Sequence, residues 1–429
     1  MIKKFCLIIS LLFLFSCREK INRMVFVNSN NVNEGETSYY TDDLVNTMTN
    51  NTGKIRVAIL VPLSGPVKNV GESLLNAAQL SLFDNKKKNV ILRPYDTKGT
   101  TFGATQAMNQ AVKDGIDVVI GPLFASETKA IQKIAKKNGV VLFSLSNEQV
   151  LANMDNVFVT GSIPEQELQL LVSYLNSIDM KNYVSLMPNN EYGANMNKTL
   201  RNIIVGKDGL LIKSDYYDSS DESLMSKITD LINYYEIPQT IYEEYQKKKQ
   251  EQKLLGETEE IPFIIQDDEK IYPQMLFIAD GGKNAENIAN LLFIIQRNNS
   301  VIQLLGTTKL DGDSSVLKNP YMEGTIFVGA NPSKYERFRK KYYETYLAEP
   351  VKISSMVYDL IKIIDKIYKQ SDGQYLPEKN ALLDPYGYDG IDGRFRFLPN
   401  GLVERNFYIL QIKNKEKHVL YNIDEFLNY

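Results

Sequence analysis

From Lys54 onward the chain alternates short apolar runs with longer amphipathic runs, and this alternation restricts the possible folds more than any other feature. The apolar run Ile55–Leu60 is typical of a buried strand, and the apolar positions from Leu74 to Leu82 recur at helical spacing. The pattern continues through strand-like and helix-like segments in turn: Val90–Tyr95, Ala104–Lys113, Val118–Ile120, Ser126–Lys137 and Val140–Ser144. Strands separated by helices form βαβ units, so the pattern predicts a mainly parallel sheet.

The same alternation restarts after Pro164, through Leu168–Leu175, Tyr183–Met187, Leu210–Tyr217, Met275–Asp280 and Asn284–Arg297. The length of this part of the chain is enough for two domains. We therefore predict an α/β fold of two Rossmann-like lobes, with mainly parallel sheets around a central cleft. We expect residues 54–163 and about 329–390 in lobe 1, and 164–328 and about 391–429 in lobe 2. Near the end, Asn400-Gly401 predicts the turn of a hairpin.

The N-terminal residues predict export and a lipid anchor. Lys3 and Lys4 precede an apolar run, Phe5–Ser16, that is too short to span a bilayer. The run ends in Leu14-Phe15-Ser16-Cys17, which resembles a bacterial lipobox in which Cys17 is acylated. We expect a lipoprotein signal peptide at 1–17 and a flexible tether at 18–53, which is rich in Asn, Ser and Thr. The alternative is an ordinary cleaved signal with a cysteine nearby by chance.

The composition argues against several classes of site. The other cysteine, Cys6, lies inside the predicted signal, so the folded part has no thiol for a disulfide, a metal site or a nucleophile. The single histidine, His418, lies in a strand-like context near the C-terminus and fits a packed or surface residue better than the base of a triad. One histidine also cannot form a site with several histidine ligands. A net charge of −3 gives no basic excess for nucleic acid. We therefore predict a protein that is not an enzyme and holds no metal and no cofactor.

A charged segment, Tyr242–Glu260, interrupts the second half. Its sequence, YEEYQKKKQEQKLLGETEE, is typical of a solvated helix and loop. The alternative interpretation is a docking surface for another protein.

Several stretches resemble a known family when they are taken in order. VAILVPLSGP, YDTKGT, VVIGPLFASE, VVLFSLSN and PNNEYG are similar in spacing to type I periplasmic binding proteins. LLNAAQLSLFD, LMPNNEYG, LLGTTKL and GYDGIDGRFRFLPNGLVER resemble more closely the lipoprotein activators of penicillin-binding proteins, in their alphaproteobacterial form. The resemblance covers nearly all of Lys54–Ile412 and implies two Rossmann-like lobes joined by crossing strands.

The resemblance also implies a ligand cleft. In binding proteins of this superfamily, loop amides and hydroxyls at helix N-termini hold the carboxylate of an amino acid. Ser126 matches the hydroxyl that contacts the carboxylate, and Tyr192 matches the aromatic residue that closes onto the ligand. The candidate cleft residues are Ser64, Ser126, Ser144, Ser146, Asn147, Tyr192, Asp280 and Thr308. From the residues alone, Ser126 at a helix start is interpreted more simply as a helix N-cap.

Two positions depart from the amino-acid binders. Thr308 stands where the acidic residue that receives the ligand ammonium is expected, and Val70 replaces an aromatic residue near the first loop. A buried ammonium needs a partner, and Asp280 is the alternative acceptor. The sequence therefore retains the carboxylate half of the site and changes the ammonium half.

Two functions follow from the resemblance. The favoured one is a periplasmic lipoprotein that activates a peptidoglycan synthase, a class A penicillin-binding protein. The alternative is a receptor that delivers an amino acid or similar small anion to an ABC importer. Arg18 after Cys17 is not the acidic signal associated with retention at the inner membrane, so we expect the outer membrane.

Overall fold

The computed structural model describes residues 54–84, 89–154, 156–255, 262–296, 301–312, 314–370 and 379–422. The predicted signal peptide, Cys17 and the tether lie outside the described residues. In the described part of the chain, no helix combines the length and apolar character that a membrane crossing requires.

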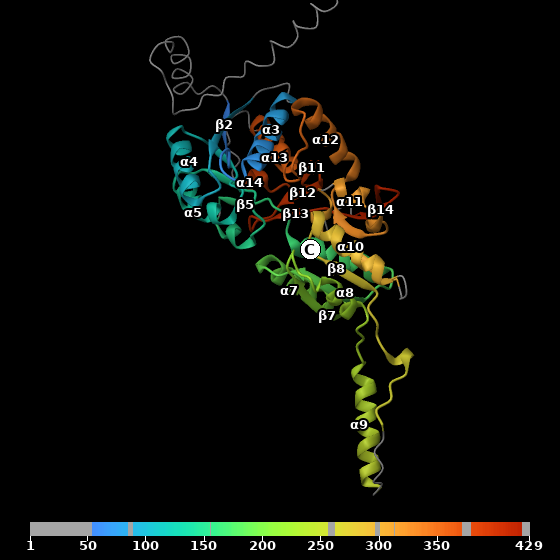
Figure 1. Cartoon of the computed structure of the whole chain (residues 1–429). Coiled ribbons are helices and arrows are strands. Elements are labelled where there is room, and N and C mark those ends of the chain that lie inside the picture. Colours follow the sequence, from blue (N-terminus) through green and yellow to red (C-terminus); the bar gives the residue numbers. More distant parts are fainter. Residues whose placement is uncertain are drawn as a thin grey trace, which may run out of the picture. The chain divides into compact units, whose positions relative to one another are not determined.

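Lobe 1 is built on a parallel five-stranded sheet in the order β2-β1-β3-β4-β5. The strands are β1 (Ile55–Val61), β2 (Val90–Asp96), β3 (Val118–Ile120), β4 (Val141–Ser144) and β5 (Val157–Val159). Helices α3 (Lys68–Asp84) and α13 (Ser354–Gln370) pack together, as do α4 (Thr101–Lys113) and α5 (Ala125–Lys137). Figure 1 shows the two pairs on either side of the sheet.

The apolar run of β1 explains this layering. Val57 and Ile59 belong to the core that contains α3 and α13, whereas Ala58 and Leu60 belong to the core that contains α4 and α5. Successive side chains of a strand point to opposite faces, so a strand covered on both faces is apolar throughout. The predicted buried strand is therefore confirmed.

Lobe 2 contains a seven-stranded sheet in the order β15-β14-β10-β9-β8-β6-β7. Its strands are β6 (Asn182–Pro188), β7 (Leu210–Tyr217), β8 (Met275–Ile278), β9 (Gln303–Gly306), β10 (Ile326–Gly329), β14 (Tyr408–Lys413) and β15 (Glu416–Asn422). The pairs from β7 to β10 are parallel, and β14 and β15 are added antiparallel. Helices α6 (Pro164–Ser177) and α7 (Glu191–Val205) cover one face, and α8 (Leu224–Ile232) and α10 (Gly282–Gln296) cover the other.

Within the described residues, the chain passes between the lobes at three places. These crossings are residues 160–163 after β5, residues 330–331 between β10 and α12 (Pro332–Tyr346), and residues 406–407 before β14. Helix α12 packs against α3, because Tyr335, Phe338 and Tyr342 share a core with Ala77 and Leu80. We call the region of the three crossings the hinge.

The return of the chain to lobe 2 comes later than the expected residue 391. A small antiparallel sheet, β11 (Tyr388–Gly390), β12 (Gly393–Phe397) and β13 (Val403–Arg405), precedes the last crossing. Phe395, Phe397 and Val403 are buried in the core of lobe 1. This apolar side of the hairpin keeps it in lobe 1, so that boundary is corrected to about 405. The hairpin itself, with Gly401 at a φ of +81° in the turn, is confirmed.

Helix α9 (Gln239–Leu254) is inserted between α8 and β8 and has no buried residue. At its base a single backbone bridge pairs Glu236 with Ile271. Figure 1 shows α9 extending away from the sheet of lobe 2. We call residues 239–255 and 262–265 the arm; it contains most of the charged segment that the sequence indicated, and residues 256–260 of that segment are not described.

Candidate functional site

The loop IGPLFASE joins β3 to α5 at the carboxyl edge of the lobe 1 sheet. Gly121 has a φ of +105°, and a Cβ there would lie 2.1 Å from the carbonyl oxygen of Leu60. Only glycine fits this approach. The helix begins at Ala125, and the backbone N–H of Phe124 donates to Glu127 Oε2 at 3.1 Å.

Ser126 is therefore not the N-cap, and the alternative capping interpretation is wrong, because Phe124 holds that position. Ser126 is exposed in the first turn, and among the described residues its hydroxyl has no hydrogen-bond partner. The hydroxyl is free to meet a ligand at the helix N-terminus.

Ser144 and Ser146 are engaged within the loop after β4. Both residues are buried; Ser144 Oγ lies 2.7 Å from Thr128 Oγ1 and accepts the N–H of Ser146 at 3.3 Å. Ser146 Oγ in turn accepts the N–H of Glu148 at 3.1 Å. These hydroxyls shape the loop.

Ser64 is engaged in a similar way at the first strand-end turn. Its Oγ donates to Asp96 Oδ2 at 2.6 Å, and Asp96 Oδ1 accepts the N–H groups of Leu63 and Lys98, each at 2.8 Å. Burial opposes ionisation of Asp96, but the hydrogen bonds from Ser64 and from these N–H groups hold its pKa below the ordinary value. The pair ties the turn after β1 to the end of β2.

Tyr192 lies in the first turn of α7, which Asn190 caps by accepting the N–H of Gly193 at 2.9 Å. Tyr192 and the exposed Asn147 line one cavity of about 430 Å³. The ammonium of Lys309 lies 3.8 Å from the centre of the Tyr192 ring. A cation of the chain itself therefore covers the aromatic face that was expected to close onto a ligand.

Thr308 is bonded to a buried carboxylate that the sequence analysis missed. The Thr308 N–H donates to Glu167 Oε2 at 3.1 Å, and its hydroxyl donates to Glu167 Oε1 at 2.9 Å. The Ser162 hydroxyl also donates to Glu167 Oε1. Burial raises the pKa of Glu167, although these hydrogen bonds act in the opposite direction. Glu167 comes from α6, and no local motif in the sequence connects it with Thr308.

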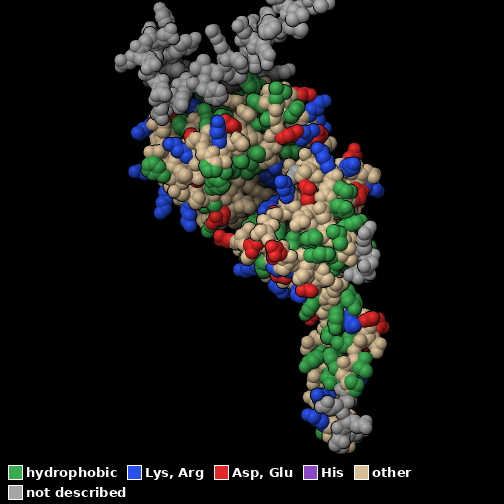
Figure 2. All heavy atoms as spheres, viewed as in Figure 1, with side chains coloured by type: hydrophobic (Ala, Val, Ile, Leu, Met, Phe, Trp, Pro, Cys, Tyr) green, Lys and Arg blue, Asp and Glu red, His purple; other side chains and the backbone are tan. Residues whose placement is uncertain are grey.

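Asp280, at the end of β8, also has its oxygens engaged. It accepts hydrogen bonds from the Tyr217 hydroxyl at 2.7 Å, the Gly281 N–H at 2.8 Å and the Asn284 amide at 3.0 Å. Asp280 lines a groove of about 980 Å³ that also contains Lys309 and Lys352. Figure 2 shows the surface hollowed between the lobes, with Lys and Arg side chains at the hollow.

The predicted site residues thus lie on several surfaces. Asn147 and Tyr192 share one cavity, Asp280 lines the large groove, and Thr308 lines a smaller cavity at the hinge. The remaining candidates, Ser64, Ser126, Ser144 and Ser146, line none of these three.

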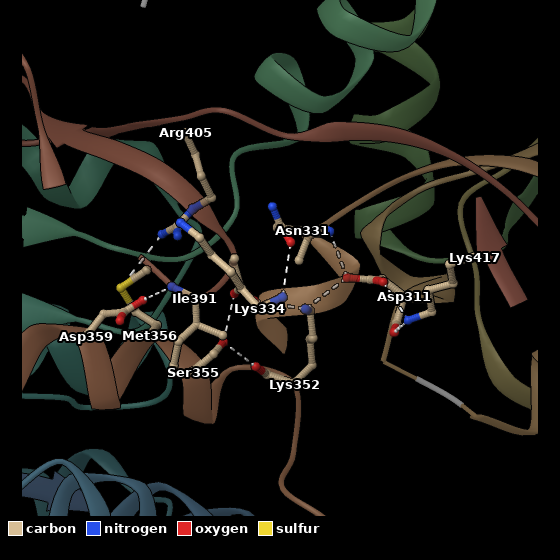
Figure 3. A network of polar contacts seen from close by, with 12 residues as sticks. Asp311, Asn331, Lys334, Lys352, Ser355, Met356, Asp359, Ile391, Arg405 and Lys417 are labelled. Carbon is tan, nitrogen blue, oxygen red and sulfur yellow. Dashed lines mark hydrogen bonds and ion pairs between the residues drawn. The ribbon is translucent and has the colours of Figure 1, made fainter. Parts of the chain in front are cut away.

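A cluster of charged residues at the hinge was not foreseen. Lys352 of lobe 1 lies 2.8 Å from Asp311 of lobe 2 and 2.9 Å from Asp392, and Lys417 lies 2.7 Å from Asp311. Burial raises the pKa of Asp311, but the two ammonium groups outweigh it and lower the pKa to about 2. Figure 3 shows Asp311, Lys352 and Lys417 meeting from separate elements. We call Asp311, Lys352, Asp359, Asp392, Arg405 and Lys417 the hinge cluster.

Asp359 belongs to the same cluster from α13. Its Oδ2 accepts the N–H of Ile391 at 2.7 Å, and burial raises its pKa to about 7. The pairs of the cluster join residues tens of positions apart, so no spacing in the sequence could indicate them.

Across the described ranges, no group of three or more His, Cys, Asp or Glu side chains is arranged to hold a metal ion. His418 is exposed on β15, opposite Gln411. The described cavities are lined by hydroxyl groups, cationic side chains and apolar side chains, and such a lining is suited to ligand binding.

Comparison with known proteins agrees with this architecture. A family model described as periplasmic binding protein matches residues 54–231. An uncharacterized protein from Rickettsia prowazekii is 26% identical over 180 residues, 42% of this chain and 48% of that protein. The Leu/Ile/Val-binding protein BraC3 of Rhizobium johnstonii is 25% identical over 130 residues, 28% of this chain and 35% of that protein.

The penicillin-binding protein activator LpoA of Histophilus somni is 25% identical over 142 residues, 32% of this chain and 23% of that protein. The matches thus span about half or less of the length of these curated relatives.

Solved structures match over a larger share of the chain. A putative branched-chain amino acid ABC transporter protein from Rhodospirillum rubrum superposes with a TM-score of 0.67 at 16% identity, covering 86% of this chain and all of that one (100%). An ABC transporter substrate-binding protein from Sphaerobacter thermophilus gives 0.66 at 16% identity, covering 87% and 98%. Together with the two sheets and the three crossings, these matches show that the chain has the two-lobe α/β fold of type I periplasmic binding proteins.

Proposed function

We propose that the protein is a non-catalytic periplasmic regulator that activates a peptidoglycan synthase of the penicillin-binding protein class by direct contact. In this proposal Cys17 carries the lipid anchor, in the outer membrane. Two observations support the proposal. One is the similarity to a penicillin-binding protein activator over 142 residues. The other is that the groups expected to receive the ammonium of an amino acid already have hydrogen-bond partners within the protein.

The observation that carries the proposal is the hydrogen bonding at Thr308. A receptor for a zwitterionic amino acid needs an anionic acceptor for the ammonium, because an unpaired buried charge is costly. At this position Thr308 donates twice to Glu167, and Ser162 donates to the same carboxylate. Asp280 already accepts three hydrogen bonds. The groups that would receive an ammonium are therefore used within the protein.

The arm supplies a surface for a protein partner. Leu254 and Leu255 are 88% and 76% exposed, and Ile264 is 68% exposed. On the same insertion the rings of Tyr245 and Phe263 lie 4.5 Å apart. Exposed apolar side chains grouped on one insertion mark a candidate interaction surface. We assign this surface to the synthase.

The test is a glycan polymerisation and crosslinking assay with the purified lipoprotein and a detergent-solubilised class A penicillin-binding protein from the same cell. We expect a several-fold increase in rate, and we expect Leu254→Glu combined with Leu255→Glu to abolish it. Val205→Glu is the matched control, because Val205 is an apolar side chain on α7 that is 71% exposed. The proposal fails if saturating lipoprotein changes neither rate and the two proteins do not co-purify.

A solute receptor for an ABC importer is the second candidate. The superposition on substrate-binding proteins over most of the chain and the cavity shared by Asn147 and Tyr192 favour it. A panel of amino acids in a thermal-shift assay tests it, since a ligand at a hundredfold its Kd stabilises by about 2.7 kcal/mol. A shift that Tyr192→Ala removes would favour the receptor over the regulator.

A further inference from the structure

Lobe 1 contains a pocket of its own that none of the predicted functions uses. Helices α3, α12 and α13 and strand β11 contribute to its wall, and Figure 1 shows these elements together in lobe 1. Its volume is about 270 Å³, near the lower end of ligand pockets in proteins. It shares no lining residue with the three cavities described above. We call it the lobe 1 pocket.

The lobe 1 pocket has more cationic than anionic side chains. Its cations come from α12 and α13 and are Lys334, Arg337, Lys341 and Lys362. Lys334 forms an ion pair with Asp389. Lys341 forms an ion pair with Asp84. Within the described residues, Arg337 and Lys362 make no hydrogen bond or ion pair. One unpaired cation from each helix therefore faces the same pocket.

The remaining carboxyl group of the pocket belongs to Asp359, which is 3% exposed. Its Oδ2 accepts the N–H of Ile391 at 2.7 Å, as Figure 3 shows, and burial raises its pKa to about 7. A bound anion would raise this pKa further, because like charges disfavour ionisation, so the carboxyl would keep its proton. With Asp359 protonated, four cations and two carboxylates give the pocket a net charge of +2.

We propose that the lobe 1 pocket binds the phosphate group of a phosphate monoester, whose oxygens pair with the guanidinium of Arg337 and the ammonium of Lys362. A dianionic phosphate matches the charge of the pocket, whereas a carboxylate supplies half of that charge. A guanidinium binds phosphate through two parallel hydrogen bonds, and a lysine adds a point charge. The protonated carboxyl of Asp359 can donate to a further phosphate oxygen. Phe338 and Ile391 provide apolar contacts for the substituent.

The phosphate can belong to a soluble metabolite or to the head group of a phospholipid, and both sources present the same dianion. The inference concerns a site within one lobe. It is therefore independent of contact with a peptidoglycan synthase and of any ligand held between the lobes.

The experiment is calorimetric titration of the full chain, at pH 7 and constant ionic strength, with inorganic phosphate, glycerol phosphate, dihexanoylphosphatidate and acetate. We expect the phosphates to bind and acetate to bind at least about tenfold more weakly, because acetate has one charge and fewer acceptor oxygens. Equal affinity for glycerol phosphate and the phosphatidate supports a soluble ligand. An affinity for the phosphatidate that is higher by about tenfold or more supports a lipid head group.

Two double variants test the residues. Arg337→Gln combined with Lys362→Gln should weaken phosphate binding by about tenfold or more, and both side chains are exposed, so the fold should be retained. Lys340→Gln combined with Lys366→Gln is the matched control. It removes the same charge from exposed positions of the same two helices, but neither residue lines the pocket, so binding should be unchanged.

The outcomes distinguish a site from a general attraction of anions to the surface. A loss confined to the variant of Arg337 and Lys362 supports the proposal. Equal losses in the two double variants overturn it, because only the net charge would then matter. The absence of binding by all of the phosphates, or equal binding of acetate and phosphate, also overturns it.

Discussion

The hinge cluster and the arm are both rich in charged residues. The charges of the arm are in contact with solvent, whereas those of the hinge cluster are largely buried. In the arm, α9 contains consecutive lysines at 247–249, and all of its residues have access to solvent. In the hinge cluster, the side chain of Asp311 is 2% exposed and lies within 2.8 Å of two ammonium groups. Charge density in the sequence therefore does not indicate where charges matter for stability.

The physical reason is the surrounding dielectric. A solvated ion pair contributes about 0–1 kcal/mol, because water competes for both partners. Removing one partner from a buried pair costs about 3–5 kcal/mol, because the other charge remains buried and unpaired. The hinge cluster should therefore respond strongly to single substitutions, and the arm should respond weakly.

Asp311→Asn is expected to give the largest effect. It removes the acid shared by Lys352 and Lys417, and we expect a loss of about 3–5 kcal/mol in the free energy of unfolding at pH 7. Because the pKa of Asp311 is lowered from 3.8 to about 2, the stabilisation is present above about pH 4 and is lost as the pH falls toward 2.

Urea unfolding monitored by circular dichroism provides the measurement. Glu244→Gln, on the exposed face of the arm, is the control and should change stability by less than about 0.5 kcal/mol. Equal effects of the two substitutions would remove the distinction between the two regions.

Asp359→Asn should change how stability depends on pH. The pKa of Asp359 is raised from 3.8 to about 7 by burial, so between these values the folded state binds more protons than the unfolded state. Stability from this group therefore falls as the pH rises from about 4 to about 7, by about 3 kcal/mol at most between pH 5 and pH 8. The variant should lack this decrease, since Asn does not ionise and still offers an oxygen to the Ile391 N–H.

Unfolding curves at pH 5 and pH 8 for both proteins provide the comparison. Glu167 is retained in the variant, so its own titration cancels in the difference between the two proteins. The same pH dependence in both would contradict the assignment to Asp359.

Replacing residues 239–265 by a short Gly-Ser linker should give the smallest effect on stability. The bridge between Glu236 and Ile271 is kept, and no residue of α9 is buried, so the cores of both lobes remain intact. We expect the midpoint of thermal unfolding to move by less than about 3 °C, with activation of the synthase lost. A large drop in the midpoint would show that the arm stabilises lobe 2.

Periodicity was sufficient to predict many of the strands and helices of both lobes, but not β5, α8, β9 or β10. The strand expected at Ile55–Leu60 is β1, Ile55–Val61, and the helix expected at Ser126–Lys137 is α5, Ala125–Lys137. These elements follow from local side-chain patterns, because each buries one face or both faces in its own lobe. The late hairpin was predicted as a hairpin but was placed in the wrong lobe, since the pattern of Phe395 and Phe397 does not identify the core that receives them.

The polar contacts were harder to predict, because the residues that form them lie far apart in the sequence. Ser126 and Thr308 were selected from the resemblance to amino-acid binders, which does not indicate Glu167, the partner of Thr308 that lies 141 residues away. Asp311 and Lys417 are 106 residues apart, and they meet only because β15 is added to the sheet of lobe 2. Such contacts depend on the topology of the whole chain.

The three crossings have a mechanical consequence. A single connection would let one lobe swivel freely against the other, whereas connections at residues 160–163, 330–331 and 406–407 must all bend together. Relative motion is thereby reduced to rotation about one axis through the crossings. Any molecule that grips both lobes then acts on a single coordinate, the opening angle, and two such molecules bound at distant places influence each other through it.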